Sequence, residues 1–307
     1  MCIRDRDYGD EIIVPAFTYV ATAEVIGLLG FTPVLVDVCP DTFNIDPKKT
    51  EKAITNKTKA IVPVHLFGQC VDMESIIEIA KMHGLYIIED SAQAIGSEFT
   101  FSNKEKKKAG TIGNIGCTSF FPSKNLGCYG DGGAIFTDDD FLAQKIKMIA
   151  NHGQNKKYYH KYIGVNSRLD TIQAAILDIK LKFLDDYNKS RQQAALIYSE
   201  NLKDVPEILT PYLSNYSTHV FHQYTIIIKN GKRDELQNFL AEKSIPANVY
   251  YPLPLNEQEA FKNISKTSED LTNTRELCNS VLSLPMHTEL TKEELTYITN
   301  TIKSFFN

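Results

Sequence analysis

Short hydrophobic segments alternate with longer amphipathic ones along the first half of the chain. Six segments have the length and the β-branched or aromatic content of buried strands, namely Glu11–Pro15, Pro33–Asp37, Ala60–His65, Leu85–Asp90, Cys117–Phe121 and Ala134–Phe136. Between them, hydrophobic residues recur at helical spacing in Thr18–Leu29, Asp72–His83 and Asp139–Asn151. This alternation predicts an α/β domain with a mostly parallel sheet.

The second half of the chain has a different pattern. Residues 167–201 contain neither Gly nor Pro, which predicts one long helix or two helices joined end to end. After them we expect a strand at Tyr224–Ile228, a helix at Asp234–Lys243 and a proline-rich loop at Tyr250–Leu255. The pattern therefore predicts a large domain over residues 1–185 and a smaller α+β domain over residues 186–307.

Composition limits the possible partners. The chain has 307 residues, with 33 Lys and Arg against 38 Asp and Glu, a net charge of −5. This mildly acidic balance predicts no nucleic-acid partner, and the longest hydrophobic runs fall short of the ~20 residues of a membrane span. The Lys104–Lys108 run is interpreted as a solvated hairpin tip. Six cysteines, at positions 2, 39, 70, 117, 128 and 278, form no CxxC pair, so we expect reduced thiols in a cytoplasmic protein.

The chain enters a core strand almost at once. Glu11–Pro15 is preceded by no predicted helix or cap, and residues 1–6 lack the hydrophobic region of a signal peptide. We interpret Met1–Arg6 as a foreign leader and expect an N-terminal segment of the large domain to be missing.

Lys124 is the first candidate catalytic residue. It follows the predicted strand Cys117–Phe121 and lies between Pro122 and the glycine-rich stretch Gly127–Gly133. A lysine held near the core has a lowered pKa, and its neutral amine can form a Schiff base. The alternative is a lysine at a strand end that extends into solvent.

Asp90 is the second candidate, because it ends the predicted strand Leu85–Asp90. Open α/β sheets bind ligands at the carboxyl ends of their strands, where a carboxylate requires a cation or a strong donor. The alternative is an N-cap of the next helix. Together with Lys124 and Ser119, Asp90 completes the set that pyridoxal 5′-phosphate requires: a carboxylate for its ring nitrogen, an amine for its aldehyde and a hydroxyl for its phosphate.

Competing patterns are weaker. The glycines of Gly127–Gly133 precede a strand, whereas a dinucleotide-binding loop must open a helix. His65, His83 and His152 lack metal-ligand spacing and are interpreted as structural, so no metal site is expected.

With these residues in hand, the chain resembles the DegT/DnrJ/EryC/StrS family of sugar aminotransferases over nearly its whole length. The resemblance rests on Phe17–Thr22, Asp41–Asp46, Glu89–Gln93, Ser119–Lys124, Gly130–Gly133, Asn151–Gln154 and Gly164–Asp170. It implies a pyridoxal-phosphate enzyme of fold type I that works as a homodimer, with the cofactor bound by the large domain.

The resemblance also implies individual roles. Lys124 would form the Schiff base with the cofactor, and Asp90 would pair with the pyridinium nitrogen. Gln93 would bond the ring hydroxyl, Tyr19 would stack on the ring, and Ser119 would bind the phosphate.

Further implied residues concern the substrate and the second subunit. Asn166 would reach the phosphate of the neighbouring subunit's cofactor, and Arg168 would clamp a sugar carboxylate there, a task suited to a bidentate donor. Tyr250 and Tyr251 stand where many relatives have His-Tyr, so their sugar contacts are expected to differ from those of the family. The stretch Thr118–Lys124 is most similar to enzymes that aminate C3 of a UDP-linked 2-acetamido-3-keto-glucuronate, with glutamate as donor, for surface polysaccharide such as O-antigen.

Several alternatives stay open. The substrate could be another dTDP- or UDP-linked keto sugar, aminated at C4 or elsewhere. A dehydratase of this family would replace Lys124 with histidine, and a cysteine desulfurase would need a mobile cysteine, for which Cys128 lies in the glycine loop. A sensor or an inactive fragment is the non-enzymatic alternative, because the family's phosphate-binding Gly-Ser/Thr loop is absent from this sequence.

Overall fold

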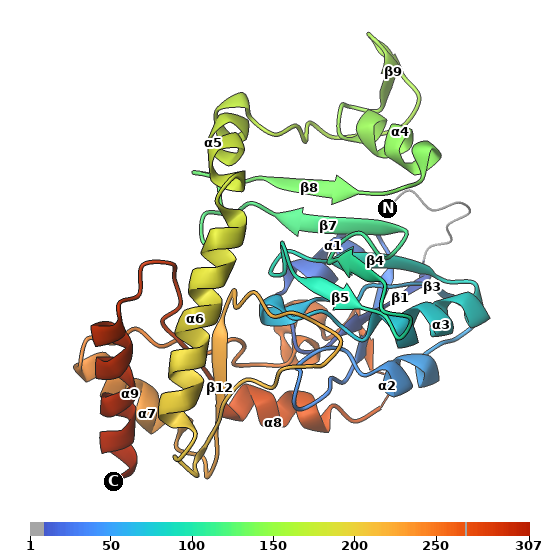
Figure 1. Ribbon diagram of the computed structural model, residues 1–307. Coiled ribbons are helices and arrows are strands. Elements are labelled where there is room, and N and C mark those ends of the chain that lie inside the picture. The colour runs from blue at the N-terminus through green and yellow to red at the C-terminus, as the bar shows by residue number, and fades with distance from the viewer. Residues whose placement is uncertain (1–8, 268) are drawn as a thin grey trace.

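The computed structural model describes residues 9–267 and 269–307, so the predicted leader Met1–Arg6 lies outside the described residues. Its main sheet has seven strands in the order β13-β2-β1-β3-β4-β7-β8 (Figure 1). These strands are β1 (Glu11–Pro15), β2 (Thr32–Val36), β3 (Thr58–Ile61), β4 (Tyr86–Asp90), β7 (Ile115–Ser119), β8 (Gly133–Phe136) and β13 (Lys266–Thr267). All neighbours are parallel except β7 and β8, which confirms the predicted mostly parallel sheet.

Both faces of the main sheet are covered, and β1 is buried along its whole length. Ile13 packs with one core layer, which includes residues of α3 (Met73–His83), and its neighbour Ile12 packs with the other layer, which includes residues of α1 (Ala21–Leu28). Successive side chains of a strand point to opposite faces of the sheet. A strand covered on both faces therefore has hydrophobic side chains on both, as Ile12 and Ile13 of β1 show.

The helical stretch predicted over residues 167–201 forms two separate helices. α5 (Thr171–Leu181) and α6 (Leu184–Leu202) follow one another with a break at Lys182 and Phe183. This confirms the second form of the prediction, two helices joined end to end.

The helix α6 lies beside the C-terminal elements (Figure 1), and a second hydrophobic core lies between them. It is formed with α7 (Arg233–Glu242), α9 (Lys292–Phe306) and an antiparallel sheet of β11 (Ile208–Leu209), β12 (Tyr224–Ile228) and β14 (Val281–Leu284). The chain also returns to the main sheet, because Leu255, Phe261 and Leu271 join the layer of Ile12, and β13 pairs with β2. The division into residues 1–185 and 186–307 is kept as a proposal, in which the second part supplies a strand to the first.

The remaining elements are short or lie at the surface. They are α2 (Pro47–Lys52), α4 (Asp140–Ile149), α8 (Thr272–Ser280), β5 (Glu98–Thr100), β6 (Lys106–Lys108), β9 (Gln154–Lys156) and β10 (Tyr159–His160), with 3-10 turns at Leu66–Gly68, Leu255–Glu257 and Glu259–Phe261. The lysines of the Lys104–Lys108 run are exposed in the β5–β6 hairpin, and Lys108 bonds Glu98 over 3.0 Å, so the solvated interpretation is confirmed.

Five of the six predicted strands have shifted bounds, three of them by a single residue and two by more. The segment Ala60–His65 is regular only to Ile61, because Pro63 has no N–H to donate to the ladder. The strand predicted at Cys117–Phe121 begins and ends two residues earlier, at Ile115 and Ser119. The prediction missed this start because Gly116 is a poor strand former, yet a Cβ there would lie 1.8 Å from the carbonyl oxygen of Gly110.

None of the helices in the described part of the chain combines the length and the hydrophobicity that a membrane span requires.

Candidate active site

The register of the parallel strands brings the predicted site residues to one edge of the main sheet. Asp90 ends β4 and pairs with Cys117 of β7, two residues before Ser119. Tyr19 follows the end of β1, which runs parallel to its neighbours. Since the carboxyl ends of parallel strands meet at the same edge, residues far apart in sequence converge there.

A cavity of about 550 Å³ opens at this edge. Seven of the nine predicted site residues line it, namely Tyr19, Asp90, Gln93, Ser119, Lys124, Tyr250 and Tyr251. The other two, Asn166 and Arg168, are exposed between β10 and α5, where Arg168 Nε donates to Asn166 Oδ1 over 3.1 Å. A second hollow, of about 610 Å³ beside α3, contains none of the nine.

The loop after β7 holds Lys124 at the cavity. The backbone amide of Lys124 donates to the carbonyl of Phe121 over 2.8 Å. The next residue, Asn125, is buried and donates from Nδ2 to Asn188 Oδ1 of α6 over 2.7 Å and to the carbonyl of Val220 over 2.9 Å. The loop that carries Lys124 is therefore tied to α6 and to the segment that precedes β12.

The environment of Lys124 favours its neutral amine. Burial lowers the pKa of Lys124, and the nearby charge of Asp90 opposes this shift only in part. A neutral amine is the form that attacks a carbonyl carbon, so the chemistry predicted from the sequence agrees with the electrostatics of the site.

Two donors hold the carboxylate of Asp90. Thr22 Oγ1 donates to Oδ2 over 2.6 Å, and the backbone amide of Ala92 donates to Oδ1 over 3.1 Å. Each oxygen keeps a further lone pair for a ligand.

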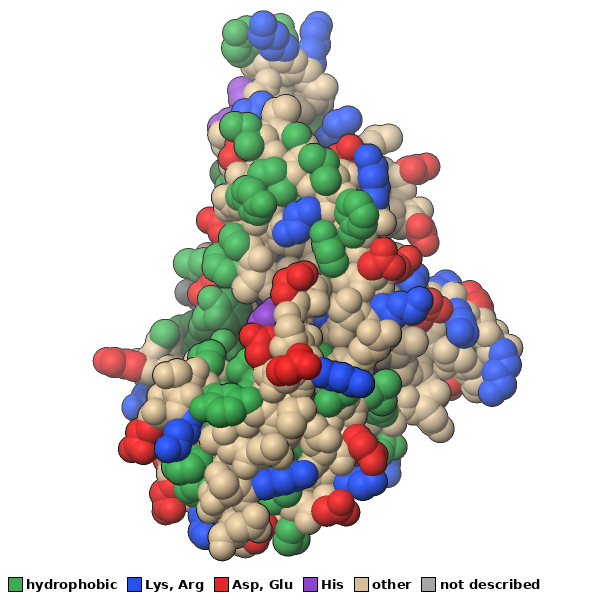
Figure 2. All heavy atoms as spheres, turned by 60° about the vertical axis from the view of Figure 1, so that its left-hand side comes forward, with side chains coloured by type: hydrophobic (Ala, Val, Ile, Leu, Met, Phe, Trp, Pro, Cys, Tyr) green, Lys and Arg blue, Asp and Glu red, His purple; other side chains and the backbone are tan. Residues whose placement is uncertain are grey.

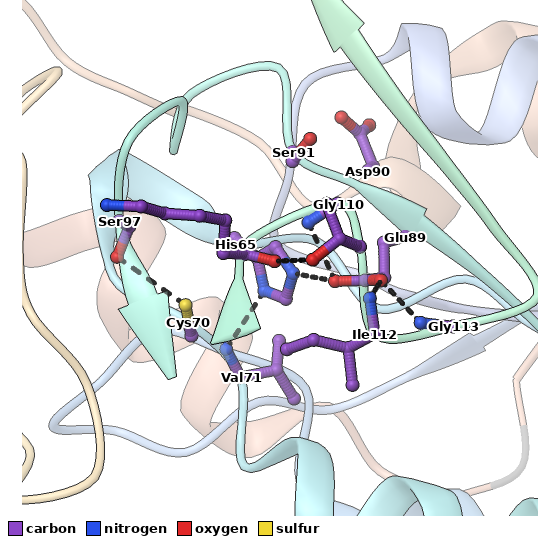
Figure 3. A network of polar contacts seen from close by, with 12 residues as sticks. His65, Cys70, Val71, Glu89, Asp90, Ser91, Ser97, Gly110, Ile112 and Gly113 are labelled. Carbon is purple, nitrogen blue, oxygen red and sulfur yellow. Dashed lines mark hydrogen bonds and ion pairs between the residues drawn. The ribbon is translucent and has the colours of Figure 1, made fainter. Parts of the chain in front are cut away.

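Glu89, the neighbour of Asp90, points to the opposite side of β4 (Figure 3). Its buried carboxylate accepts hydrogen bonds from His65 Nε2 over 2.8 Å and from the amides of Gly110, Ile112 and Gly113 over 2.9, 2.6 and 2.5 Å. Burial alone would raise the pKa of Glu89, but these donors, His65 first, hold it below its usual value. His65 is thus structural, as predicted, and the network fixes the strand end that carries Asp90.

An aromatic cluster forms the opposite wall of the cavity. Gln93 Nε2 donates to the hydroxyl of Tyr251 over 3.2 Å, and the ring of Tyr251 lies 6.3 Å from that of Tyr19. Burial raises the pKa of the Tyr251 phenol, so Tyr251 stays protonated and neutral. Tyr19 is 58% exposed, which leaves its ring free to stack on a ligand.

The sequence prediction missed several cavity groups. Thr22 bonds Asp90, and the buried Thr18 and His222 line the cavity. The hydroxyl of Thr18 and Nδ1 of His222 are buried without a hydrogen-bond partner among the described residues. Thr18 and Thr22 lie in the stretch that supported the family resemblance, whereas no sequence signal places His222 beside Lys124.

These groups fit pyridoxal 5′-phosphate. The cavity offers a carboxylate for the ring nitrogen, an amine of lowered pKa for the aldehyde and an aromatic face at Tyr19. Ser119 Oγ accepts from the amide of Phe121 over 3.2 Å, so its own hydrogen is free to bond a phosphate oxygen. Thr18 Oγ1 and His222 Nδ1, which have no partner among the described residues, are available to form hydrogen bonds with further polar atoms of a ligand. No group of acidic, histidine or cysteine side chains in the described ranges could hold a metal ion.

The sheet and this constellation together define a pyridoxal-phosphate-dependent transferase of fold type I. Residues 3–303 match the model of the DegT/DnrJ/EryC1/StrS aminotransferase family, and the chain belongs to this family. Its enzymes are aminotransferases that use pyridoxal 5′-phosphate, and the similar solved structures include forms with this cofactor or its amino form bound.

Individual relatives are similar over most of their length. The chain is 48% identical over 300 residues to the pleiotropic regulatory protein of Geobacillus stearothermophilus, covering 97% of this chain and 79% of that protein. It is 47% identical over 279 residues to the UDP-2-acetamido-2-deoxy-3-oxo-D-glucuronate aminotransferase of Pseudomonas aeruginosa, covering 91% and 75%. The crystal structure of a family aminotransferase from Brucella abortus superposes with a TM-score of 0.91 at 41% identity, covering 97% and 80%.

These comparisons identify the chain as a sugar aminotransferase of the kind that acts on nucleotide-linked keto sugars. The geometry also speaks against a cysteine desulfurase, because Cys128 is fully buried, does not line the cavity and bonds the carbonyls of Phe120 and Gly130.

Proposed function

We propose that the chain transfers an amino group from glutamate to C3 of a UDP-linked 2-acetamido-3-keto-glucuronate. The observation that carries the aminotransferase chemistry is the convergence of Lys124 and Asp90 on one cavity. The choice of sugar is supported by the 47% identity to the aminotransferase from Pseudomonas aeruginosa, whose name states that substrate. Other relatives are named for dTDP- and GDP-linked sugars, so a different nucleotide sugar is the alternative that the assay must test.

Each residue at the cavity would make a different contact with the cofactor. When bound, pyridoxal phosphate supplies an electron sink for the bond to the α-proton of the amino donor. Asp90 would hold the proton on the ring nitrogen, Gln93 would bond the ring hydroxyl, and Ser119 would bind the phosphate. Tyr19 would pack on one face of the ring and exclude water from it.

Lys124 would carry protons as well as bind the cofactor. Its amine, of lowered pKa, would take the proton from the donor's α-carbon and deliver it to C4′ of the cofactor. For the keto sugar the same amine would act in the reverse direction, and its lowered pKa makes release of the proton easier than from a lysine in water.

We further propose a homodimer in which each chain completes the other's site. Asn166 would reach the partner's cofactor phosphate, and Arg168 would bind the carboxylate of the sugar. Both side chains are exposed and neither lines the cavity of its own chain, which agrees with this role. Exposed hydrophobic side chains occur in the neighbouring elements, among them Ile172 and Ile179 of α5 and Ile135 of β8. Figure 2 shows hydrophobic side chains gathered on the upper part of one face of the molecule, which supports an interface.

The cellular setting follows from the substrate. We propose that the enzyme works in the cytoplasm on the path to a surface polysaccharide such as O-antigen. The five cysteines at described positions are free thiols, which agrees with a reducing compartment.

The decisive assay incubates the chain with pyridoxal phosphate, glutamate and a panel of UDP- and dTDP-linked sugars carrying a 3-keto or 4-keto group. We expect 2-oxoglutarate and an amino sugar to form fastest with the 3-keto glucuronate, and Lys124→Ala to abolish both products. Faster turnover of a 4-keto sugar would replace the substrate proposal, and no turnover of any keto sugar would overturn the function.

A regulatory role is the second candidate, because the 48% identical relative from Geobacillus stearothermophilus is named a pleiotropic regulatory protein. Cofactor binding without amine transfer to any sugar of the panel would favour it.

A further inference from the structure

Thr22 joins two elements that are far apart in the sequence. It lies in the first turn of α1, is only 6% exposed, and its hydroxyl donates to Asp90 Oδ2 at the end of β4 over 2.6 Å. Such a short bond to an ionised oxygen is charge-assisted and stronger than a bond between neutral groups. The contact therefore ties the position of α1 to the orientation of the carboxylate.

The second oxygen of Asp90 is held independently. The amide of Ala92 donates to Oδ1 over 3.1 Å, so the two oxygens are fixed from two directions. A carboxylate held at both oxygens has one orientation, and it presents its remaining lone pairs in a fixed direction. The backbone amide of Ala92 cannot be removed by a side-chain substitution. Thr22 is therefore the donor to Asp90 that a substitution can remove.

Two ionisable side chains near Asp90, those of Cys117 and Tyr251, carry no positive charge that would balance its carboxylate. Burial, followed by the charge of Asp90, raises the pKa of Cys117 to about 11, and burial raises the pKa of Tyr251. Both side chains are neutral at pH 7, so the stabilisation of this anion comes from the hydrogen bonds donated by Thr22 and Ala92.

We propose that Thr22 is a positioning residue that acts through Asp90: its hydroxyl fixes the carboxylate so that the cavity selects a ring with a protonated pyridine nitrogen. The inference rests on the proposed function, in which Asp90 pairs with that nitrogen. Thr22 itself touches no cofactor atom in this account. Its effect must therefore depend on the ring nitrogen.

The test compares two ligands that differ only at that atom. The dissociation constants of pyridoxal 5′-phosphate and of its 1-deaza analogue, which carries a CH in place of the ring nitrogen, are measured by absorbance titration of the cofactor-free protein. The wild type is expected to prefer the cofactor. Thr22→Val, which keeps the shape and removes the hydroxyl, is expected to reduce this preference about tenfold, and Thr22→Ser to restore it.

The chain offers a matched control. Thr274 Oγ1 donates to Asp37 Oδ1 over 2.7 Å in a fully buried pair, which lies outside the cavity. Thr274→Val should lower stability and leave the preference between the two ligands as in the wild type. If Thr22→Val does not fold, Thr22→Ala removes the same hydroxyl.

The possible outcomes separate the two claims. Equal weakening of both ligands by Thr22→Val, or an unchanged preference, would overturn the role of Thr22 while leaving the proposed function intact. A wild-type protein that binds neither compound, or that binds both equally well, would overturn the pairing of Asp90 with the nitrogen and the inference with it.

Discussion

Substitution of Glu89 by glutamine tests whether the buried network behind Asp90 supports the site. The carboxylate is fully buried and receives four donors, two on each oxygen. The amide of Val71 donates to His65 Nδ1 over 3.1 Å, so the ring proton of His65 lies on Nε2 and points at Glu89. All four donors therefore require an acceptor (Figure 3).

The magnitude follows from this geometry. Glu89→Gln replaces one oxygen by an amide nitrogen, so two donors face another donor whichever way the amide turns. Hydrogen bonds to a charged group contribute about 1.5–3 kcal/mol, and a buried donor without a partner costs about 1–3 kcal/mol. We expect the free energy of unfolding to fall by about 3–5 kcal/mol, because bonds to a charged group are lost and two buried donors are left without an acceptor.

The assay is urea denaturation of the cofactor-free protein at pH 7. Glu98→Gln is the matched control, because Glu98 is a surface glutamate paired with Lys108, and its loss should cost less than about 1 kcal/mol. A loss of less than about 1 kcal/mol in Glu89→Gln, or equal losses in the two variants, would refute the reasoning.

The pH dependence of the same experiment has a definite sign. The folded-state pKa of Glu89 is lowered, so the carboxylate contributes stability above its unfolded value near 4.5 and loses that contribution as the pH falls through the folded-state pKa. The difference between the wild type and Glu89→Gln should therefore narrow in acid. A constant difference would contradict an ionised Glu89.

Three further predictions concern other parts of the molecule. Because burial lowers the pKa of Lys124 below its unfolded value of 10.5, the folded state binds the proton of this lysine less tightly than the unfolded chain, which costs stability below pH 10.5. Lys124→Met should therefore raise the urea midpoint of the cofactor-free protein at pH 7, and this gain should vanish above pH 10.5. A gain that persists there would contradict the assignment. Gly116→Ala would place a Cβ 1.8 Å from the carbonyl oxygen of Gly110 and should cost about 3 kcal/mol or more in the same assay, whereas a cost below about 1 kcal/mol would show that the strand can move. Lys124→Ala and Arg168→Ala should each be inactive alone but regain amine transfer when unfolded and refolded together, because a mixed dimer then has one site with both residues; a mixture without activity would exclude the shared site.

Much of the site could be predicted because it depends on strand ends. Asp90 and Ser119 each end a buried strand, and parallel strands bring their carboxyl ends to one edge whatever the packing of the side chains. Lys124 follows within the same loop and is held there by backbone bonds and by its neighbour Asn125. Hydrophobic periodicity and chain direction are enough to predict such a convergence.

Other features could not be predicted because they depend on pairs of side chains from separate elements. The bond between Thr22 and Asp90 spans 68 positions, and His222 enters the cavity from the segment that precedes β12. The periodicity of either segment is the same whether or not these contacts form. The roles of Asn166 and Arg168 depend on a second copy of the chain, which no pattern within one sequence determines.

The central claim is that Lys124 and Asp90 bind the same pyridoxal phosphate ring, and peptide mapping tests it most directly. The protein is incubated with the cofactor, reduced with borohydride and digested, and the modified residue is identified by mass spectrometry in the wild type and in Asp90→Asn. The account predicts the phosphopyridoxyl group on Lys124 in the wild type and a marked loss of this labelling in Asp90→Asn at limiting cofactor. Labelling spread over surface lysines, or labelling of Lys124 that is indifferent to Asp90, would contradict it.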